Sequence, residues 1–423
     1  TNAQKRVSKE ISYDLSLKKP MLRLVQGDVG AGKTIIAALA AIQAIAQGYQ
    51  VAFMAPTDLL TEQHAINLKK WLEPLNIKVL RLSGKMKIAE RRIALAALAD
   101  NSCQLIVGTH ALFQNEVLFA RLGLVIIDEQ HRFGVEQRLL LQQKGQQEQF
   151  TPHQLLMTAT PIPRTLSMTH FAHLDISIID ELPPGRSPIT TAVLSQEKRE
   201  SIIERLKEAI STGKQAYWVC TLIEESEKLQ CIAATDTAEK LQLQLISARV
   251  GLIHGKMKGL EKEATMAAFK AGDIDLLVAT TVIEVGVDVP NASLMIIENA
   301  ERLGLSQLHQ LRGRVGRGTV QSHCLLLYQS PLSRHGSERL KIMRATTDGF
   351  LISEKDLELR GAGEVLGTKQ TGYRQFKLAM LPRDQSLLSA LPEIAQQLVR
   401  TELEIARGIT QLWLGNFEQF LQG

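Results

Sequence analysis

The chain has 423 residues, 45% of them hydrophobic and 22% charged, which is the composition of a soluble globular protein too long for a single hydrophobic core. No apolar run reaches the roughly 18 residues that a membrane span needs, and the four cysteines lack metal-like spacing, which indicates reduced thiols of a cytosolic protein. The net charge of +5 is modest, and the aromatic content of 4% argues against a surface built mainly from base-stacking platforms.

The first part of the chain alternates short apolar runs with longer amphipathic stretches. Each apolar run is bounded by Gly, Pro or Asp, which is typical of βαβ units and of a parallel sheet buried on both faces. The predicted strands lie at 22–27, 51–57, 79–83, 104–110, 122–129 and 154–160. A proline-rich stretch over 180–190 then indicates a linker. We therefore expect a first α/β domain over residues 1–183.

A second set of apolar runs predicts a second parallel sheet, in a domain over residues 184–330. Its strands are expected at 215–221, 250–255, 274–281, 293–300 and 323–329. After about 331 the strands stop, and residues 331–423 should form a helical hairpin (332–347 and 350–359), a loop (360–372) and a helical tail. Ser353 and Asp356 have the spacing of a helix capping box. The predicted fold class is α/β, with two tandem parallel-sheet domains followed by these helical elements.

The stretch "GDVGAGKT" (27–34) fits the phosphate-loop pattern G-x-x-x-x-G-K-[ST] between a strand and an Ala-rich helix. Its glycines let backbone amides curl around phosphates, and the helix N-terminus adds positive potential. A chance glycine-rich turn is the alternative, but the strand–loop–helix context argues against it. The predicted ATP-binding residues are Gly27, Gly30, Ala31, Gly32, Lys33 and Thr34. Lys33 should reach the β and γ phosphates, and Thr34 should ligate Mg²⁺.

Two further motifs suit nucleotide hydrolysis. The apolar strand in "LVIIDEQH" (124–131) ends in adjacent acids, so Asp128 can hold Mg²⁺ through water while Glu129 polarises the attacking water. Two surface charges are the alternative, which the preceding apolar strand argues against. In "HQLRGRVGRG" (309–318), Arg314 and Arg317 stand three apart among glycines, with no acidic residue among their sequence neighbours. A solvated basic turn is the alternative there.

These motifs, with "MTAT" (157–160), resemble those of superfamily-two helicases. Longer strings are similar to the RecG family of bacterial ATP-dependent helicases, which act on stalled forks and branched DNA: "APTDLLTEQH", "DEQHRFGVEQR", "TATPIPRTL", "TVIEVGVDVPNA" and "RGAGEVLGTKQTG". The resemblance covers essentially all 423 residues and implies two RecA-like domains. It matches the family's motor portion, without the amino-terminal wedge domain that splits the branch. The start at Thr1 rather than Met also leads us to expect a fragment.

The resemblance implies that Gln310, Arg314 and Arg317 face the γ-phosphate of ATP held by the first domain. Arginine fingers of this kind stabilise charge on the transferred phosphoryl group when the domains close. The resemblance also implies that Gln4 reads adenine and that Gly286 and Asp288 line the cleft from the second domain. It implies that His131, Thr158 and Thr160 are couplers, which link the ATP site to the DNA contacts. A surface glutamine is the alternative for Gln4, and a packed core histidine is the alternative for His131.

Contacts with DNA are expected at strand ends, where loop hydroxyls and amides can grip phosphates without reading sequence. The candidates are Thr57, Gly108, Thr109 and Thr281. The hairpin and the loop 360–372 resemble the family's translocation element, in which Arg339 and Arg360 position the element and Gln370 lies at its moving end. An ordinary domain cap is the alternative for these helices. The related transcription-repair coupling factor carries a similar element, so this feature does not separate the two families.

The leading hypothesis is an ATP-dependent translocase on double-stranded DNA that remodels stalled forks and branched recombination intermediates. One alternative is the motor of a coupling-factor-like translocase, and another is an ATP-gated nucleic-acid clamp. A clamp would need a defective acid or finger, whereas Glu129, Arg314 and Arg317 are all present. The resemblance implies ATP and Mg²⁺ as cofactors, forked or branched DNA as partner, no membrane, and a monomer. It also suggests a single-stranded-DNA-binding protein as partner and a bacterial cytoplasmic, nucleoid-associated location.

Overall fold

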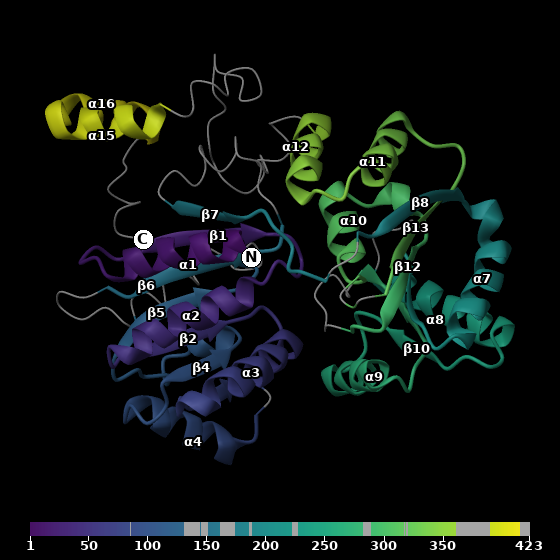
Figure 1. The fold of residues 1–423 in the computed structure, drawn as a ribbon, viewed down its shortest axis with the longest axis horizontal. Coiled ribbons are helices and arrows are strands. Elements are labelled where there is room, and N and C mark those ends of the chain that lie inside the picture. Colours follow the sequence, from purple (N-terminus) through teal and green to yellow (C-terminus); the bar gives the residue numbers. More distant parts are fainter. Residues whose placement is uncertain are drawn as a thin grey trace.

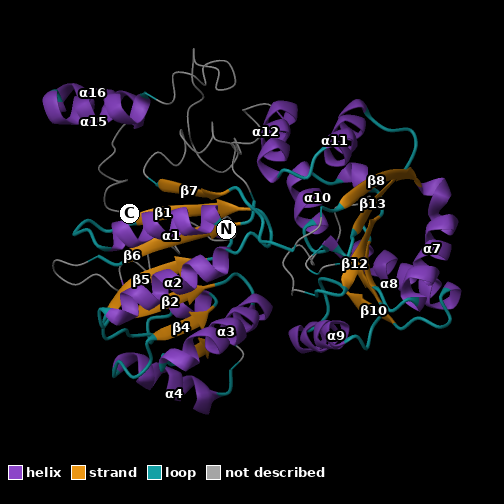
Figure 2. Ribbon diagram, viewed as in Figure 1, coloured by secondary structure: helices purple, strands orange, loops and turns teal. Residues whose placement is uncertain are grey.

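A computed structural model shows two parallel sheets, each covered by helices on both faces (Figures 1 and 2). The structure describes residues 1–84, 86–130, 144, 151–160, 174–185, 188–221, 227–281, 289–316, 318, 320–360 and 390–414. None of the described helices combines the length and the apolar character that a bilayer crossing requires. We retain 183/184 and 330/331 as proposed domain limits.

The first sheet has seven strands in the order β3-β4-β2-β5-β6-β1-β7, and its described ladders are all parallel. Its strands are β1 (Leu22–Gly27), β2 (Gln50–Met54), β3 (Val79–Leu82), β4 (Leu105–Gly108), β5 (Leu122–Ile127), β6 (His153–Thr158) and β7 (Asp175–Ile179). Its helices are α1 (Asn2–Leu15), α2 (Lys33–Ala46), α3 (Asp58–Leu72), α4 (Ile88–Ala99) and the 3-10 turns η1 (Glu73–Leu75) and η2 (His110–Phe113).

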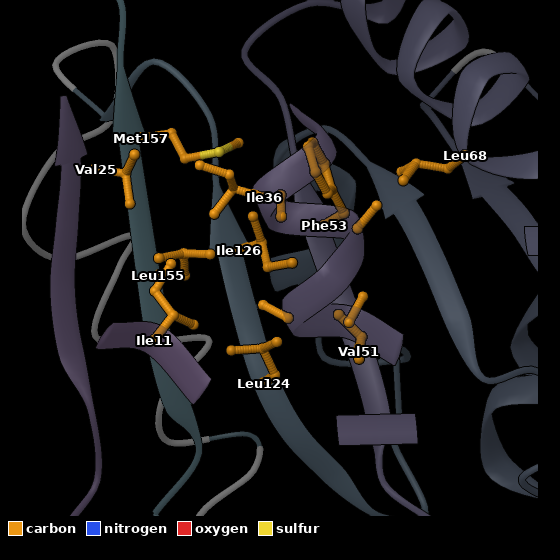
Figure 3. Packing of buried hydrophobic residues seen from close by; sticks show 14 of the residues in the cluster. Ile11, Val25, Ile36, Val51, Phe53, Leu68, Leu124, Ile126, Leu155 and Met157 are labelled. Carbon is orange, nitrogen blue, oxygen red and sulfur yellow. The ribbon is translucent and has the colours of Figure 1, made fainter. Parts of the chain in front are cut away.

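Alternate residues of the central strands supply two separate cores, because successive strand side chains point to opposite faces. Phe53 and Ile126 pack beneath α1, α2 and α3 on one face (Figure 3). Met54 and Ile127 pack against α4 and η2 on the other face. Burial on both faces explains why these strands appear in the sequence as continuous apolar runs rather than as alternating ones.

The second sheet has six strands in the order β10-β11-β9-β12-β13-β8, and its described ladders are also parallel. Its strands are β8 (Thr190–Ser195), β9 (Gln215–Val219), β10 (Val250–Ile253), β11 (Leu276–Ala279), β12 (Ala292–Ile297) and β13 (His323–Tyr328). Its helices are η4 (Gln196–Lys198), α7 (Arg199–Ser211), α8 (Glu227–Gln244), α9 (Gly259–Ala271), η6 (Ala300–Arg302) and α10 (Leu305–Arg312).

The predicted helical hairpin is confirmed as α11 (Arg334–Ala345) and α12 (Gly349–Arg360), which lie beside α10 (Figure 1). Leu340, Met343 and Ile352 belong to the same buried cluster as the second sheet, so the hairpin is anchored to the second domain. The tail forms α15 (Leu391–Thr401) and α16 (Leu403–Leu414), which pack on each other.

The capping-box prediction is wrong. Ser353 and Asp356 lie inside α12 and are buried, with exposed fractions of 6% and 8%. The residue that caps the helix is Asp348, whose Oδ1 accepts the N–H groups of Phe350 at 2.8 Å and Leu351 at 3.3 Å. An S-x-x-D spacing therefore occurred by chance one turn inside the helix.

The eleven predicted strands are confirmed, and the fold class with them. Two strands were missed, β7 and β8, which flank the predicted linker. Each is the edge strand of its sheet, and β8 contains no fully buried residue. An edge strand needs less apolar surface than a central one, so neither produced a continuous apolar run.

Candidate nucleotide-binding and inter-domain site

The phosphate loop lies between β1 and α2, at the carboxyl end of the first sheet. Gly30 and Gly32 have φ angles of 79° and 88°, in the left-handed region that favours glycine. The helix α2 then begins at Lys33, and its N-cap residue Gly32 has no side chain, so the first N–H groups of the helix are not bonded to a capping side chain. Such groups attract anions, so the loop is built to receive phosphate. It brings together Gly27, Gly30, Ala31, Gly32, Lys33 and Thr34.

The ammonium group of Lys33 lies within this loop. Its Nζ donates to the carbonyl of Gly27 at 2.7 Å and to that of Asp28 at 3.0 Å, and the residue is only 9% exposed. A phosphate would offer the same ammonium a charged acceptor, which makes a stronger hydrogen bond than a carbonyl.

Gln4 on α1 lies against the phosphate loop. Its Nε2 donates to the carbonyl of Ala31 at 2.9 Å, and a Cβ added at Gly32 would collide with the same amide. This placement favours a site residue over a surface glutamine. The adenine-reading role stays a prediction.

Asp128 follows β5 and is almost completely buried. His64 on α3 donates from Nε2 to Asp128 Oδ2 at 2.8 Å, and the N–H of Glu129 donates to Asp128 Oδ1 at 3.1 Å. Burial pushes the pKa of Asp128 upward, but the hydrogen bond and charge of His64, followed by the charge of Lys33, outweigh it and leave the pKa below its ordinary value. The carboxylate is therefore charged at neutral pH, as a metal ligand must be.

Glu129 has a φ angle of 50°, a backbone conformation that non-glycine residues seldom adopt and that is often found at functional sites. Burial raises its pKa, and the neighbouring charge of Asp128 raises it further, while Lys33, a hydrogen bond from Ala159 and the charge of Arg314 act in the opposite direction. The Ala159 N–H reaches Glu129 Oε2 at 3.3 Å. A carboxyl group with a raised pKa is a better proton acceptor than an ordinary one.

The turn after β6 joins the first domain to the second. Thr160 donates its N–H to Thr158 Oγ1 at 3.1 Å, which holds the turn closed. From the second domain, Gln310 donates from Nε2 to Thr160 Oγ1 at 2.6 Å. The predicted couplers Thr158 and Thr160 and the predicted Gln310 are thus brought together.

A second contact between the domains starts from Asp28 in the phosphate loop. His309 on α10 donates from Nε2 to Asp28 Oδ1 at 3.0 Å, and Arg312 donates to His309 Nδ1 at 3.1 Å. Because an arginine only donates, His309 must carry its hydrogen on Nε2. Burial pushes the pKa of Asp28 upward, but the hydrogen bond from His309 and the nearby charge of Lys33 act in the opposite direction and leave that pKa lowered.

Arg312 continues this contact to the helical hairpin. Its guanidinium is buried and donates to the carbonyls of Met343 and Thr346, both at 2.8 Å, at the end of α11. The backbone also approaches closely here, because a Cβ at Gly313 would lie 2.9 Å from the Cβ of Val29 in the phosphate loop. Only glycine fits Gly313 without moving the domains apart.

Several predicted site residues lie outside the described residues: His131, Gly286, Asp288, Arg317 and Gln370, together with the side chain of Arg360. Of the predicted arginine fingers the structure therefore describes Arg314, whose charge acts on Glu129. Arg314 follows α10 and comes close enough to the acid pair for its charge to act there, while its contact with the γ-phosphate stays a prediction.

The predicted DNA contacts lie at strand ends, as expected. Thr57 follows β2 and caps α3, accepting the N–H of Leu60 at 3.3 Å. Thr109 follows β4 and caps η2, with its side chain buried. Gly108 is required by packing, since a Cβ there would lie 2.8 Å from a neighbouring carbonyl oxygen, and Thr281 follows β11. Their contacts with DNA stay a prediction.

Arg339 joins the hairpin to the second domain. It donates from Nη1 to the carbonyl of Leu303 at 3.0 Å and from Nη2 to that of Glu301 at 2.7 Å, just before α10. The predicted positioning role is supported by this geometry.

Four residues of the site were not found from the sequence: Asp28, His64, His309 and Arg312. Each of them stands inside one of the motifs named above, but it bonds a residue that lies far away in the chain. His64 is 64 residues from Asp128, and His309 is 281 residues from Asp28. His64, His309 and Arg312 are buried polar residues of helices, but their burial becomes visible only in the folded structure.

A glycine loop, a strand-end acid pair and an arginine just after α10, brought together by two parallel-sheet domains, define a two-domain helicase core. In agreement, residues 1–169 match the DEAD/DEAH box helicase family and residues 197–319 match the helicase conserved C-terminal domain. A chain of Dbp5 from S. cerevisiae is 14% identical and superposes with a TM-score of 0.58 over 84% of this chain and 93% of its own, which shows a shared fold.

Closer relatives narrow the class. ATP-dependent DNA helicase RecG of Escherichia coli O157:H7 is 59% identical over 421 residues, 99% of this chain and 61% of the relative. RecG of Pasteurella multocida strain Pm70 is 59% identical over 419 residues, 99% of this chain and 60% of the relative. A solved structure of RecG bound to a three-way DNA junction is 41% identical, with a TM-score of 0.75 over 92% of this chain and 50% of that chain.

Residues 346–414 match the family described as ATP-dependent DNA helicase RecG, domain 3, C-terminal. The chain belongs to the RecG family of ATP-dependent DNA helicases. It spans about three fifths of the length of the curated relatives that it matches. The coupling-factor interpretation is not favoured by these matches.

Proposed function

We propose that this chain is an ATP-hydrolysing motor that moves on double-stranded DNA and acts on forked or branched DNA. The observation that carries the proposal is that the second domain contacts the first at two points, the phosphate loop through Asp28 with His309 and the turn after β6 through Thr160 with Gln310. A site assembled from two domains changes when they move, so nucleotide turnover and domain motion become one cycle. The 41% identical RecG structure with a three-way DNA junction supports the choice of substrate.

The residues of the first domain fit ATP with Mg²⁺. Among the described residues, no group of three or more His, Cys, Asp and Glu side chains could hold a metal ion. In the proposed site, Thr34 and Asp128 would hold Mg²⁺ together with phosphate oxygens, because oxygen atoms are the hard ligands that Mg²⁺ prefers. Bound Mg²⁺ would supply charge neutralisation at the phosphates. Lys33 would exchange its loop carbonyls for phosphate oxygens.

Glu129 is assigned the role of orienting and deprotonating the attacking water. Its burial and raised pKa suit a proton acceptor, and the Ala159 N–H fixes one of its oxygens. Arg314 and Arg317 are assigned to stabilise charge on the transferred phosphoryl group. Gln310 would couple phosphoryl transfer to the turn after β6 in the first domain, because its side chain bonds Thr160 in that turn.

The hairpin is assigned to convert domain motion into movement on DNA. Arg312 and Arg339 tie α11 to α10 and to the turn before it, so a shift of α10 is passed to the hairpin. The loop that contains Gln370 would contact DNA at the moving end. A monomeric state, a single-stranded-DNA-binding protein as partner, and a cytoplasmic, nucleoid-associated location belong to this proposal.

The test is ATPase activity of the 423-residue chain with no DNA, single-stranded DNA, linear duplex, a three-way junction and RNA of matched length. We expect stimulation by duplex and by the junction, with little from single strands or RNA. Nucleotide binding without turnover on any substrate would indicate a clamp and contradict the motor assignment. Equal stimulation by RNA and by duplex DNA would contradict the assignment of the substrate.

A further inference from the structure

We propose that His64 is a positioning residue that holds Asp128 in the orientation required for Mg²⁺ and links this acid to the DNA-facing start of α3. The inference rests on the proposed function, because it gives the metal-binding acid a partner and a route to DNA. The observation behind it is the buried hydrogen bond that His64 on α3 makes with Asp128 at the end of β5.

The bond is short, buried and directional. The His64 and Asp128 side chains are 8% and 11% exposed, and 2.8 Å separates Nε2 from Oδ2. Since a charged carboxylate can only accept, His64 donates. The other oxygen accepts the Glu129 N–H at 3.1 Å, so each carboxylate oxygen has one fixed donor. The carboxylate can therefore not rotate freely, and its remaining lone pairs point in a defined direction.

A packed core histidine is the competing explanation, and the surroundings of His64 argue against it. Its ring lies 4.7 Å from that of Phe53, in an apolar layer beneath α3. Its second nitrogen, Nδ1, is buried and has no hydrogen-bond partner in the part of the chain that the structure describes. Burying an unsatisfied nitrogen is costly, and an apolar residue would avoid that cost. The bond to Asp128 is the feature that an apolar residue could not supply.

The helix α3 connects this bond to the surface. Thr57 caps its first turn, and His64 follows seven residues later, two turns along the same face. Between them, Leu59 packs against the core cluster of the second domain. The start of α3 therefore touches the second domain and, in the proposed function, a DNA phosphate. A displacement of this rigid helix would move the His64 ring and with it the Asp128 carboxylate.

The test replaces His64 by Leu and by Gln in the 423-residue chain. The readout is equilibrium binding of a fluorescent, slowly hydrolysed ATP analogue, measured against Mg²⁺ concentration and in EDTA. His64→Leu should raise the Mg²⁺ concentration for half-maximal binding roughly tenfold or more, as loss of an outer-shell partner does. Binding in EDTA should be nearly unchanged. His64→Gln can still donate from Nε2, so it should recover most of the Mg²⁺ dependence.

The same variants test the link to DNA. Stimulation of ATPase by duplex DNA, taken as a ratio to the activity without DNA, should fall for His64→Leu and return for His64→Gln. The matched control is His153→Leu, which removes another hydrogen-bonded histidine from the first sheet. His153 accepts the N–H of Met21 at 2.9 Å, at the amino end of β6 and away from the acids. Its Mg²⁺ dependence should equal that of the parent.

Two results would overturn the inference alone: a parental Mg²⁺ dependence in His64→Leu, or an equal loss of binding in EDTA and in Mg²⁺ for both variants with lowered melting temperatures. The second result would make His64 a packing residue. A parent chain that shows no Mg²⁺-dependent binding of nucleotide would overturn the proposed function, and this inference with it.

Discussion

The two domains are built on the same sheet, yet only the first carries a phosphate loop. Without its edge strand β7, the first sheet has the order β3-β4-β2-β5-β6-β1, which matches β10-β11-β9-β12-β13-β8 strand for strand. The match extends to the tips of β5 and β12. Asp128 and Glu298 each donate a backbone N–H to the neighbouring strand at 2.9 Å, and Glu129 and Asn299 follow with φ angles of 50° and 48°.

The domains differ in what the acid at the strand tip meets. In the second domain, Arg199 starts α7 and bonds Glu298 at 2.9 Å, with its guanidinium 5.1 Å from the Trp218 ring centroid. In the first domain, the corresponding Lys33 follows a glycine loop and bonds loop carbonyls instead. In the second domain, the position that corresponds to the phosphate loop is thus filled by the ion pair between Arg199 and Glu298. On the same scaffold, the first domain therefore has a glycine loop where the second has an ion pair, and in the proposed function that loop receives the phosphates of ATP.

The largest expected effect comes from Arg314, which the second domain contributes to the site of the first. Arg314→Ala should lower turnover by roughly 10³-fold or more, on the usual worth of an arginine finger. Nucleotide affinity should change much less, because the guanidinium acts mainly in the transition state. The checks are steady-state ATPase and equilibrium nucleotide binding, with Arg302→Ala as the control on an exposed basic residue. A large loss of affinity with parental turnover would instead make Arg314 a clamp for bound phosphate.

The next largest effect is expected at Glu129, whose counterpart in the second domain is Asn299. Glu129→Gln should lower turnover by about 10²-fold to 10⁴-fold, the range for loss of a general base, while nucleotide binding is retained. Its effect on stability should be favourable at pH 8. The pKa of Glu129 is raised by burial and by Asp128, so the charged folded form costs stability above the folded pKa.

The raised pKa of Glu129 also sets how the stability of the parent changes with pH. As pH falls through the folded pKa toward the ordinary glutamate value of 4.5, the parent regains the lost stability and the difference from Glu129→Gln shrinks. Chemical denaturation at several pH values measures this difference. A Glu129→Gln variant that is less stable than the parent at pH 8 would contradict the raised pKa of Glu129. A variant that hydrolyses ATP within a few-fold of the parent would contradict the role of Glu129 as general base.

A smaller effect, of opposite sign, is expected in the second domain. Glu298→Gln leaves the Arg199 guanidinium without its carboxylate, and should destabilise by about 2 kcal/mol, less than for a fully buried pair because Arg199 is partly exposed. Turnover per folded molecule should stay near that of the parent. Calorimetry and ATPase on the same sample measure both quantities. Loss of turnover without loss of stability would show that the second strand tip is chemically active.

The two strand tips also show what the sequence could predict. The phosphate loop, the acid pair and eleven strands follow from local patterns, because glycine spacing and apolar runs are properties of neighbouring residues. The partners of the acids do not follow, because Glu298 meets Arg199 and Asp128 meets His64 only after the chain has folded. The edge strands β7 and β8 were missed for a related reason, since the burial that marks a central strand is weaker at an edge.

The smallest expected effect concerns the hydrogen bond between His309 of the second domain and Asp28 of the first. His309→Ala removes the hydrogen bond to Asp28, a bond to a charged group worth about 1.5 kcal/mol. The closed arrangement should therefore be roughly tenfold less favoured, since 1.4 kcal/mol corresponds to a factor of ten. Because closure completes the site, we expect KM for ATP to rise by a similar factor, while turnover at saturating ATP changes little.

A double-mutant cycle makes this prediction specific. If His309 acts through Asp28, then the double variant Asp28→Ala with His309→Ala should raise KM by less than the product of the two separate fold-changes, because each change alone already removes the same hydrogen bond. His335→Ala, on the exposed face of α11, is the matched control and should leave KM unchanged. Fully additive effects would mean that the two residues act separately, and that the domains do not close through this pair in solution. Loss of DNA stimulation in His309→Ala but not in Asp28→Ala would instead place the role of His309 in its bond with Arg312, which holds the end of α11.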